Sequence, residues 1–176
     1  MIFTETKLKG AFFIEPERLQ DERGFFARTW CQQEFEQQGL NRRLLQCNIS
    51  FNPQKGTLRG MHYQVAPHAE AKLVRCTAGA IYDVILDLRP ESLTFKHHIG
   101  VILSAENYKM LYVPERFAHG FQTLEDNTEV FYQMSEFYHP ESAKGVRWND
   151  PAFGINWLLD VTLISPKDRH YPNFIS

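Results

Sequence analysis

Apolar and polar residues alternate with a period of two along most of this 176-residue chain. Such alternation is typical of strands that bury one face, because successive side chains of a strand point to opposite sides of the sheet. Turn-forming residues such as Pro53, Gly79 and Asn127 separate the alternating segments. The pattern predicts eight strands, around Phe12–Ile14, Leu44–Ser50, Leu73–Cys76, Ala80–Leu86, His97–Leu103, Met110–Val113, Gly120–Thr123 and Glu129–Phe137.

Helical signals are few. The segment Gln32–Gln38 is rich in Gln and Glu, has Phe35 for an inward face and ends at Gly39, a suitable C-cap. A second short helical turn is predicted near Ala105–Asn107. Many short strands with little helix predict an all-β fold, an antiparallel β-sandwich or barrel that forms a single domain over residues 1–176. We favour a cupin-type jelly roll, although periodicity alone leaves the strand order open.

Composition and charge exclude several classes of function. The 19 Lys and Arg residues nearly balance 21 Asp and Glu, so no strong positive field attracts nucleic acid. No apolar run approaches the roughly 18 residues of a membrane span, and the N-terminus lacks a signal-peptide pattern. Cys31, Cys47 and Cys76 are widely spaced, which favours free thiols in a cytoplasmic protein. We expect neither nucleic acid nor a membrane as a partner.

Two histidines lie beside glycines in strand-like segments, His62 in LRGMHYQ and His119 in FAHGF. Taken alone, each is more typical of a structural histidine bonded to nearby backbone. Arg59 and His62 would face opposite sides of a regular strand unless Gly60 carries a bulge. A glycine in such a strand often marks a close approach of backbone or ligand.

A metal site of the cupin type would need a second histidine two residues after His62, and Gln64 occupies that position. Two histidines without a well-placed carboxylate fall short of the three protein ligands of a catalytic site. The adjacent His97 and His98 would point to opposite faces of a strand. The sequence therefore predicts no metal site.

Seven motifs occur in a characteristic order: DERGFF (21–26), LRGMHYQ (58–64), AKLVRC (71–76), LSAEN (103–107), FAHGF (117–121), WNDP (148–151) and SPKD (165–168). Together they resemble the dTDP-4-dehydrorhamnose 3,5-epimerase family of metal-free cupins, over about residues 5–172. The resemblance implies a jelly-roll homodimer that needs no cofactor. Its substrate would be a nucleotide-diphosphate sugar, a 4-keto-6-deoxyhexose inverted at C3 and C5, usually on the way to L-rhamnose.

The resemblance also implies catalytic roles. His62 would be the general base, and the Asp168 carboxylate would orient its ring. Lys72 would stabilise the enolate oxygen, with His119 nearby. Tyr132 would deliver a proton to the opposite face of the sugar. Outside this context, Lys72 suits a strand edge, Tyr132 a core and Asp168 a turn.

Nucleotide binding is implied for a further set of polar residues and for two aromatic walls. Arginine and lysine suit a diphosphate, arginine through bidentate contacts. These positions are Arg23, Gln46, Asn48, Arg59, Lys72, His119 and Lys167, with Phe26 and Tyr138 beside the base. We also expect Phe117, Phe121 and Phe131 to surround the reacting sugar together with Tyr132.

Four positions depart from the pattern of the family. Arg28 and Ala143 stand where glutamates are usual, Glu70 replaces the common Gln, and Arg116 replaces a Gly. One mismatched polar group in a pocket costs about 1–3 kcal/mol, so the nucleotide stays open. The alternatives are an epimerase of C3 or C5 alone acting on another nucleotide sugar such as a CDP-linked one, a non-catalytic sugar-binding cupin, and a metal-dependent cupin oxygenase.

Overall fold

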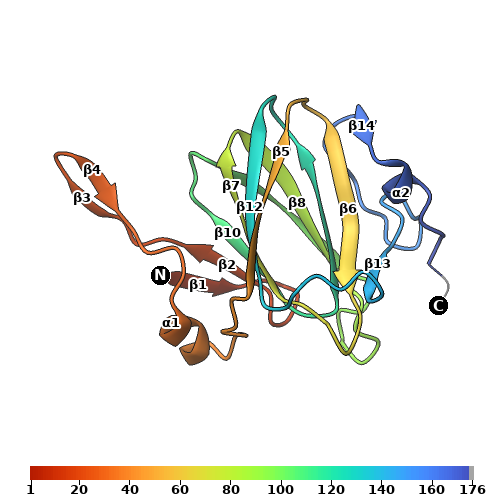
Figure 1. Cartoon of the computed structure of the whole chain (residues 1–176), viewed down its shortest axis with the longest axis horizontal. Helices are drawn as coiled ribbons and strands as arrows, with labels where there is room; N and C mark the ends of the chain where they lie inside the picture. The colour runs from red at the N-terminus through yellow and green to blue at the C-terminus, as the bar shows by residue number, and fades with distance from the viewer. Residues whose placement is uncertain (175–176) are drawn as a thin grey trace.

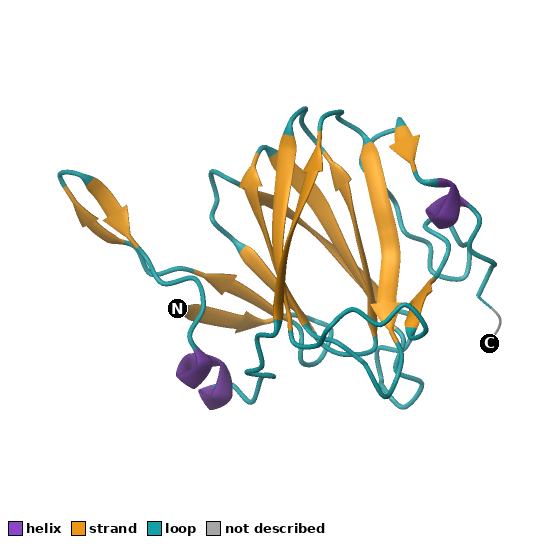
Figure 2. Ribbon diagram, in the orientation of Figure 1, coloured by secondary structure: helices purple, strands orange, loops and turns teal. Residues whose placement is uncertain are grey.

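The computed structural model describes residues 1–174 and consists mostly of two six-stranded sheets and a separate hairpin (Figures 1 and 2). This architecture confirms the predicted all-β jelly roll. The first sheet contains, in spatial order, β1 (Ile2–Glu5), β2 (Phe12–Glu15), β10 (Met110–Val113), β7 (Lys72–Ala78), β12 (Thr128–Met134) and β5 (Gln46–Asn52). The second contains β13 (Ala143–Gly145), β6 (Thr57–Gln64), β11 (Phe117–Thr123), β8 (Ala80–Asp87) and β9 (His98–Ser104), with β14 (Leu163–Ile164) paired to β6. The hairpin consists of β3 (Leu19–Asp21) and β4 (Gly24–Phe26).

Each of the eight predicted strands is present, with ends displaced by at most three residues. The last one ends at Met134 instead of Phe137, because the Glu136 side chain accepts the Phe137 amide proton and removes it from the ladder. The predicted helical turn at Ala105–Asn107 is a hydrogen-bonded turn instead of a helix. There Asn107 Oδ1 accepts the amide protons of Ser104 and Lys109, as asparagine commonly does in turns.

Helix α1 (Gln32–Gln37) agrees with the prediction. Its one buried side chain, Phe35, packs edge-on against the rings of Phe3 and Tyr112. Gly39 follows the helix with a φ of +69°, a left-handed conformation that glycine adopts without steric cost. Helix α1 therefore packs against the first sheet through a single aromatic anchor.

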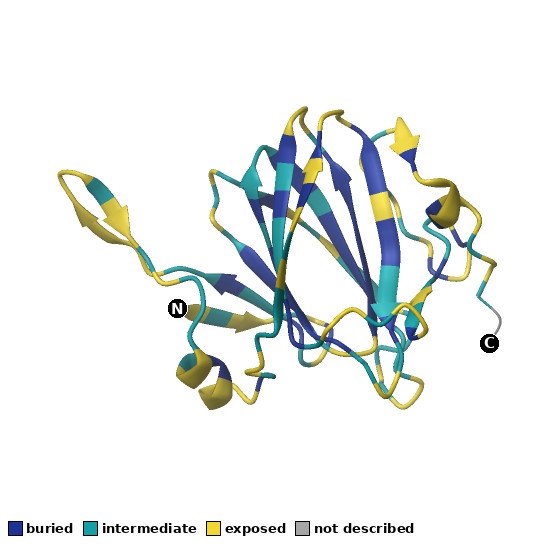
Figure 3. Cartoon of the chain, in the orientation of Figure 1, coloured by how far each residue is buried: buried dark blue, intermediate teal, exposed yellow. Residues whose placement is uncertain are grey.

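The main core lies between the sheets. Strands of both contribute fully buried residues to one cluster, among them Val74, Leu111 and Val130 from the first and Ile81 and Ile85 from the second. A further cluster covers the outer face of the second sheet with aromatic side chains from the C-terminal segment. Strand β11 is therefore buried along its whole length and β8 at every position except the half-buried Tyr82, so both strands are mostly blue in Figure 3. None of the helices within residues 1–174 is long and apolar enough to cross a membrane.

Candidate active site

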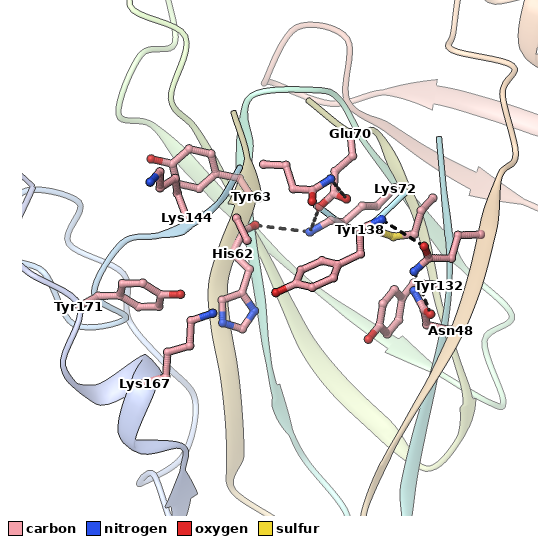
Figure 4. A pocket seen from close by; sticks show the side chains of 14 residues that line it. Asn48, His62, Tyr63, Glu70, Lys72, Tyr132, Tyr138, Lys144, Lys167 and Tyr171 are labelled. Carbon is pink, nitrogen blue, oxygen red and sulfur yellow. Dashed lines mark hydrogen bonds and ion pairs between the residues drawn. The ribbon is translucent and has the colours of Figure 1, made fainter. Parts of the chain in front are cut away.

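A cavity of about 450 Å³ opens between the two sheets and is lined by polar and aromatic side chains (Figure 4). Strands β5, β6, β7 and β12 supply most of its wall, and the rest comes from β13, from the loops before β7 and after β12, and from the C-terminal segment. Its lining residues are Gln46, Asn48, His62, Tyr63, Gln64, Glu70, Lys72, Tyr132, Met134, Tyr138, Ala143, Lys144, Lys167 and Tyr171. Seven of the residues predicted from the sequence are among them, which brings most of the expected site together.

His62 and Asp168 form a close pair at this cavity, with 2.6 Å between His62 Nε2 and Asp168 Oδ1. Asp168 is only 4% exposed, and its second oxygen accepts the Gly60 amide proton at 3.2 Å. Burial opposes ionisation of this carboxyl, but the hydrogen bond and charge of His62 and the Gly60 amide outweigh it and lower the pKa of Asp168. The ionised carboxylate therefore binds the Nε2–H tautomer of His62 and leaves the Nδ1 lone pair free.

Helix α2 (Pro166–Arg169) positions Asp168 beneath His62. Ser165 caps this helix by accepting the Asp168 amide proton, and Pro166 occupies the first helical position, where its missing amide proton has no cost. Strand β14, directly before the helix, pairs in parallel with β6. The S-P-K-D segment is thus a capping motif as well as a source of the carboxylate.

An irregularity in β6 lets Arg59 and His62 share one cavity. His62 lies opposite His119 on β11, whereas Arg59 lies opposite Phe121, so β6 has one additional residue between them. Gly60 has a φ of +129°, and a Cβ atom there would lie 2.5 Å from the Gly120 Cα. The predicted close approach at Gly60 is therefore one of backbone to backbone. Arg59 and His62 both line a second cavity of about 480 Å³ beside α2.

Lys72 is nearly buried at the start of β7 and is held by two acceptors. Its Nζ lies 3.0 Å from Glu70 Oε1 and donates to the His62 carbonyl oxygen at 3.4 Å. The other Glu70 oxygen accepts a hydrogen bond from the side-chain amide of Gln64. Figure 4 shows this connected group on the cavity wall. The lysine cation is therefore fixed close to His62 and partly neutralised by the carboxylate of Glu70.

Tyr132 and Tyr138 contribute phenol groups to the cavity from different elements. Tyr132 lies on β12, opposite Asn48 of β5. Burial raises the pKa of Tyr132, so its hydroxyl stays protonated at neutral pH. Tyr138 lies in the loop after β12 and is mostly exposed, and its amide donates to Gln46. In Figure 4 both phenol rings and the His62 imidazole lie around the same space.

His119 is placed next to His62 but does not line the cavity. It is buried, and its Nε2 lies 2.7 Å from Oδ1 of the fully buried Asp83. Asp83 was not predicted from the sequence, although a lone aspartate inside the apolar strand β8 is a recognisable signal. The histidines of adjacent strands β6 and β11 thus each pair with an aspartate. Only the pair that contains His62 borders the cavity.

The polar residues predicted for the nucleotide divide between the two cavities. Gln46 and Asn48 line the main cavity and are joined by a 3.2 Å hydrogen bond. Lys167 lines both cavities. Arg59 lines the second one, and its Nε donates to Asn52 at 2.7 Å. These four side chains provide amides and cations to the two cavities that adjoin His62.

Arg23 and Phe26 lie elsewhere. They belong to the hairpin β3–β4, which projects away from the sheets at the left of Figure 1. Phe26 is 72% exposed, and the exposed Arg23 is paired with Asp21. Phe117 and Phe121, expected around the sugar, instead pack in the main core, 2% and 4% exposed. Both side chains therefore belong to the core between the sheets and do not line the cavity around His62.

The atypical residues also have defined surroundings. Ala143 lines the main cavity. Arg28 lines a different cavity of about 360 Å³ near the N-terminus, where its Nη1 lies 2.9 Å from Glu34 Oε1. Arg116 is paired with Glu91 on the surface. Within one chain, Arg28 and Arg116 therefore lie outside the cavity that holds His62.

Several lining residues were not predicted from the sequence, namely Tyr63, Met134, Lys144 and Tyr171. Tyr171 approaches His62 edge-on, with 6.2 Å between ring centroids. Burial raises the pKa of this phenol. Its position depends on the course of the C-terminal segment, which periodicity does not describe. Of these four residues, only Tyr63 had a usable signal in the sequence, because it directly follows His62.

Comparison with known proteins gives a consistent result. The sequence profile described as dTDP-4-dehydrorhamnose 3,5-epimerase matches residues 5–176. The curated dTDP-4-dehydrorhamnose 3,5-epimerase of Methanothermobacter thermautotrophicus is 44% identical over 172 residues, which cover 96% of this chain and 92% of that protein. The chain is thus similar to this enzyme along nearly its whole length.

Solved structures agree. The crystal structure of dTDP-4-dehydrorhamnose 3,5-epimerase from Elizabethkingia anophelis superposes with a TM-score of 0.96 at 41% identity, covering 99% of this chain and 96% of that one. The dTDP-6-deoxy-D-glucose 3,5-epimerase of Legionella pneumophila, in complex with dTDP-4-keto-L-rhamnose, gives a TM-score of 0.88 at 39% identity, with coverages of 95% and 89%. The similarity therefore includes a structure with a nucleotide sugar bound.

Proposed function

Because the chain belongs to the dTDP-4-dehydrorhamnose 3,5-epimerase family, we propose that the cavity around His62 inverts C3 and C5 of a dTDP-linked 4-keto-6-deoxyhexose. The chain is an isomerase of nucleotide sugars, an epimerase of dTDP-rhamnose biosynthesis. One observation carries the assignment of residues: the His62–Asp168 pair at 2.6 Å adjoins a cavity that also contains Lys72 and Tyr132. Those four groups provide a base, its partner, a cation and an acid.

Proton removal begins at His62. Its Nδ1 lone pair takes the proton from the carbon beside the ketone, and the electron pair of the C–H bond moves to the carbonyl oxygen to form an enolate. The Asp168 carboxylate stabilises the imidazolium that results. Lys72 donates a hydrogen bond to the enolate oxygen, where a cation in a secluded site has its largest effect.

Inversion requires the new proton to arrive from the other side. The Tyr132 hydroxyl donates it to the carbon as the enolate electron pair returns to form the C–H bond. The raised pKa of Tyr132 keeps this group protonated at neutral pH, as an acid must be. Proton exchange with water then restores His62 and Tyr132 for the second carbon.

Binding of the nucleotide follows from the charges beside the reacting groups. Lys167 and Arg59 suit the diphosphate, arginine through its planar donors. Gln46 and Asn48 offer amides to polar atoms of the base or sugar, and Tyr138 offers an aromatic surface. The free thiols of Cys31, Cys47 and Cys76 support a reducing, cytoplasmic location.

A homodimer accounts for the hairpin β3–β4. Its exposed apolar side chains, Leu19 and Phe26, line the cavity near the N-terminus that also contains Arg28, and neither they nor the exposed Arg23 line the cavity around His62. An exposed patch of this kind is typical of an interface. In the dimer, Arg23 and Phe26 of one copy would complete the nucleotide site of the other.

Deuterium exchange tests the proposal directly. With dTDP-4-dehydro-6-deoxyglucose in D2O, we expect deuterium at C3 and C5 by NMR. His62→Ala should abolish exchange at both carbons and leave dTDP binding largely intact. Tyr132→Phe should lower the rate of epimerisation about 100-fold or more while exchange continues, since the proton still leaves. Absence of exchange in the wild type with dTDP-, UDP-, GDP- and CDP-linked 4-keto sugars would refute the function.

A further inference from the structure

Two loops meet at the end of the barrel where β6 and β12 finish, at the bottom of Figure 1. They consist of residues 65–71, between β6 and β7, and residues 135–142, between β12 and β13. His68 from the first loop and Glu136 and His139 from the second offer ligand atoms that all lie within 4.8 Å of one another. Among residues 1–174 this is the one group of three such side chains, and the proposed epimerisation uses none of them.

The two imidazoles are arranged face to face. Their centroids lie 3.4 Å apart, and the planes of the rings differ by 12°. Two ligands of a tetrahedral Zn²⁺, each about 2.0–2.1 Å from the metal, lie about 3.3 Å apart. The lone pairs of the ring nitrogens lie in the ring planes, so both rings must rotate about their side-chain torsions before one nitrogen of His68 and one of His139 face a common ion.

Glu141 orients one of these rings. Its Oε1 lies 3.2 Å from His139 Nδ1. When Nδ1–H donates to this carboxylate, the lone pair of His139 is on Nε2, where it is available to a metal. A ligand histidine almost always donates its other ring proton to a carboxylate or carbonyl in this way.

Gln64 fixes the backbone that carries both histidines. Its amide nitrogen donates to the carbonyl oxygens of His68 and Phe137, each at 3.0 Å, and its amide oxygen accepts the His139 amide proton at 2.6 Å. Gln64 is itself buried. The ligand-bearing loops are thus joined before any ion binds, which reduces the entropy lost on binding.

Glu136 provides the negative charge. Its Oε1 accepts the Phe137 amide proton at 2.9 Å, which holds the carboxylate beside the two imidazoles. Its side chain is 15% exposed. The competing cation is the Arg43 guanidinium, which is 57% exposed and 3.5 Å from Glu136 Oε2, a weak contact that an ion can replace.

We propose that His68, Glu136 and His139 bind a divalent transition-metal ion, Zn²⁺ foremost, with water as the fourth ligand. Two imidazoles and one carboxylate form a known donor set for Zn²⁺. The site is separate from His62 and Lys72, so the ion takes no part in proton transfer. Its effect is to join two loops whose residues adjoin Tyr138, a wall of the main cavity.

Calorimetric titration of EDTA-treated protein with Zn²⁺ tests the site. We expect one ion per chain, and His68→Ala, His139→Ala and Glu136→Gln should each lower the affinity more than tenfold. Glu141→Gln should lower it about tenfold, as for other residues that orient a ligand. Arg43→Ala should raise it, by up to about fivefold, because it removes the competing cation.

Two variants serve as controls: the exposed His97→Ala and the catalytic His62→Ala should both bind Zn²⁺ like the wild type. Co²⁺ should give the intense visible absorption of a tetrahedral site, absent in Glu136→Gln. Glu136→Gln and Glu141→Gln keep the shape of the side chain, so they remain informative if an alanine variant fails to fold. Zn²⁺ affinity unchanged within twofold in Glu136→Gln and in the histidine variants, loss of binding in His62→Ala, or no binding by the wild type would overturn the proposal.

Discussion

Asp168 connects three separate features of the site: its carboxylate binds the His62 ring and the Gly60 amide in the irregular strand β6, and its backbone amide donates to the Ser165 hydroxyl that caps α2. Since folding lowers the pKa of Asp168, the ionised group stabilises the fold above about pH 4, the ordinary value for aspartate. That stabilisation is lost as the pH falls through the lowered value. The carboxylate therefore stabilises the fold at neutral pH, where the proposed mechanism also requires it to be ionised.

Asp168→Asn should separate these effects by pH. We expect the free energy of unfolding to fall by about 2 kcal/mol near pH 7, because a buried charged hydrogen bond is lost. The difference from wild type should shrink below about pH 4. Urea unfolding over this pH range measures it, and the exposed Asp160→Asn serves as the control. A difference that stays constant down to about pH 3 would contradict the assignment.

Glu70 is the second residue with a testable charge effect. Its carboxylate neutralises Lys72 in a cavity that must accept an anionic nucleotide. Glu70→Gln should strengthen dTDP binding several-fold, measured by titration at low and high salt. It should also lower the free energy of unfolding by about 3 kcal/mol, because a buried cation loses its partner. Glu91→Gln, on the surface, should change neither, and weaker dTDP binding by Glu70→Gln would show that Glu70 serves the substrate itself.

At the scale of elements, the close approach of β6 to β11 supports the site. A Cβ atom on Gly60 would meet the backbone of β11, whose atoms have little freedom to move. Gly60→Ala should therefore lower the free energy of unfolding by at least about 3 kcal/mol, adding overpacking to an unfavourable φ. The matched control is Gly154→Ala, which also has positive φ but nothing within 4 Å, and it should cost about 1–2 kcal/mol. Equal losses in urea unfolding would show that packing at Gly60 is unimportant.

The elements differ in how well their sequences predict them. Strands such as β8 and β12 are predictable because their apolar residues repeat with the local period of a strand. Strands β13 and β14, of three and two residues, exist through pairing with β6, a long-range interaction that no local pattern expresses. Helix α2 had a local signal, the S-P-K-D cap, but this segment was used only to predict the Asp168 carboxylate and not the helix.

The site shows the same division. Residues near one edge of the barrel, such as His62, Lys72 and Tyr132, were predicted from family motifs, and the fold places them around one cavity. Glu141 and His68 carried no motif, because their proximity to other groups depends on how two loops meet. Arg23 and Phe26 were predicted by motif, yet the fold of one chain leaves them far from that cavity. A motif identifies residues that act together without stating that they come from the same chain.

At the scale of the whole molecule, the proposed exchange of hairpins between two copies predicts complementation. His62→Ala and Arg23→Ala should each be nearly inactive as homodimers. In a mixed dimer, the chain with intact His62 receives the intact hairpin of its partner, so one of the two sites is complete, and the other carries both defects. Equal mixing makes about half of all dimers mixed, and each mixed dimer has one complete site out of two. Total activity should therefore return to about a quarter of the wild type. Light scattering should show dimers throughout, and activity that stays at the level of the separate variants would place the hairpin outside the partner's site.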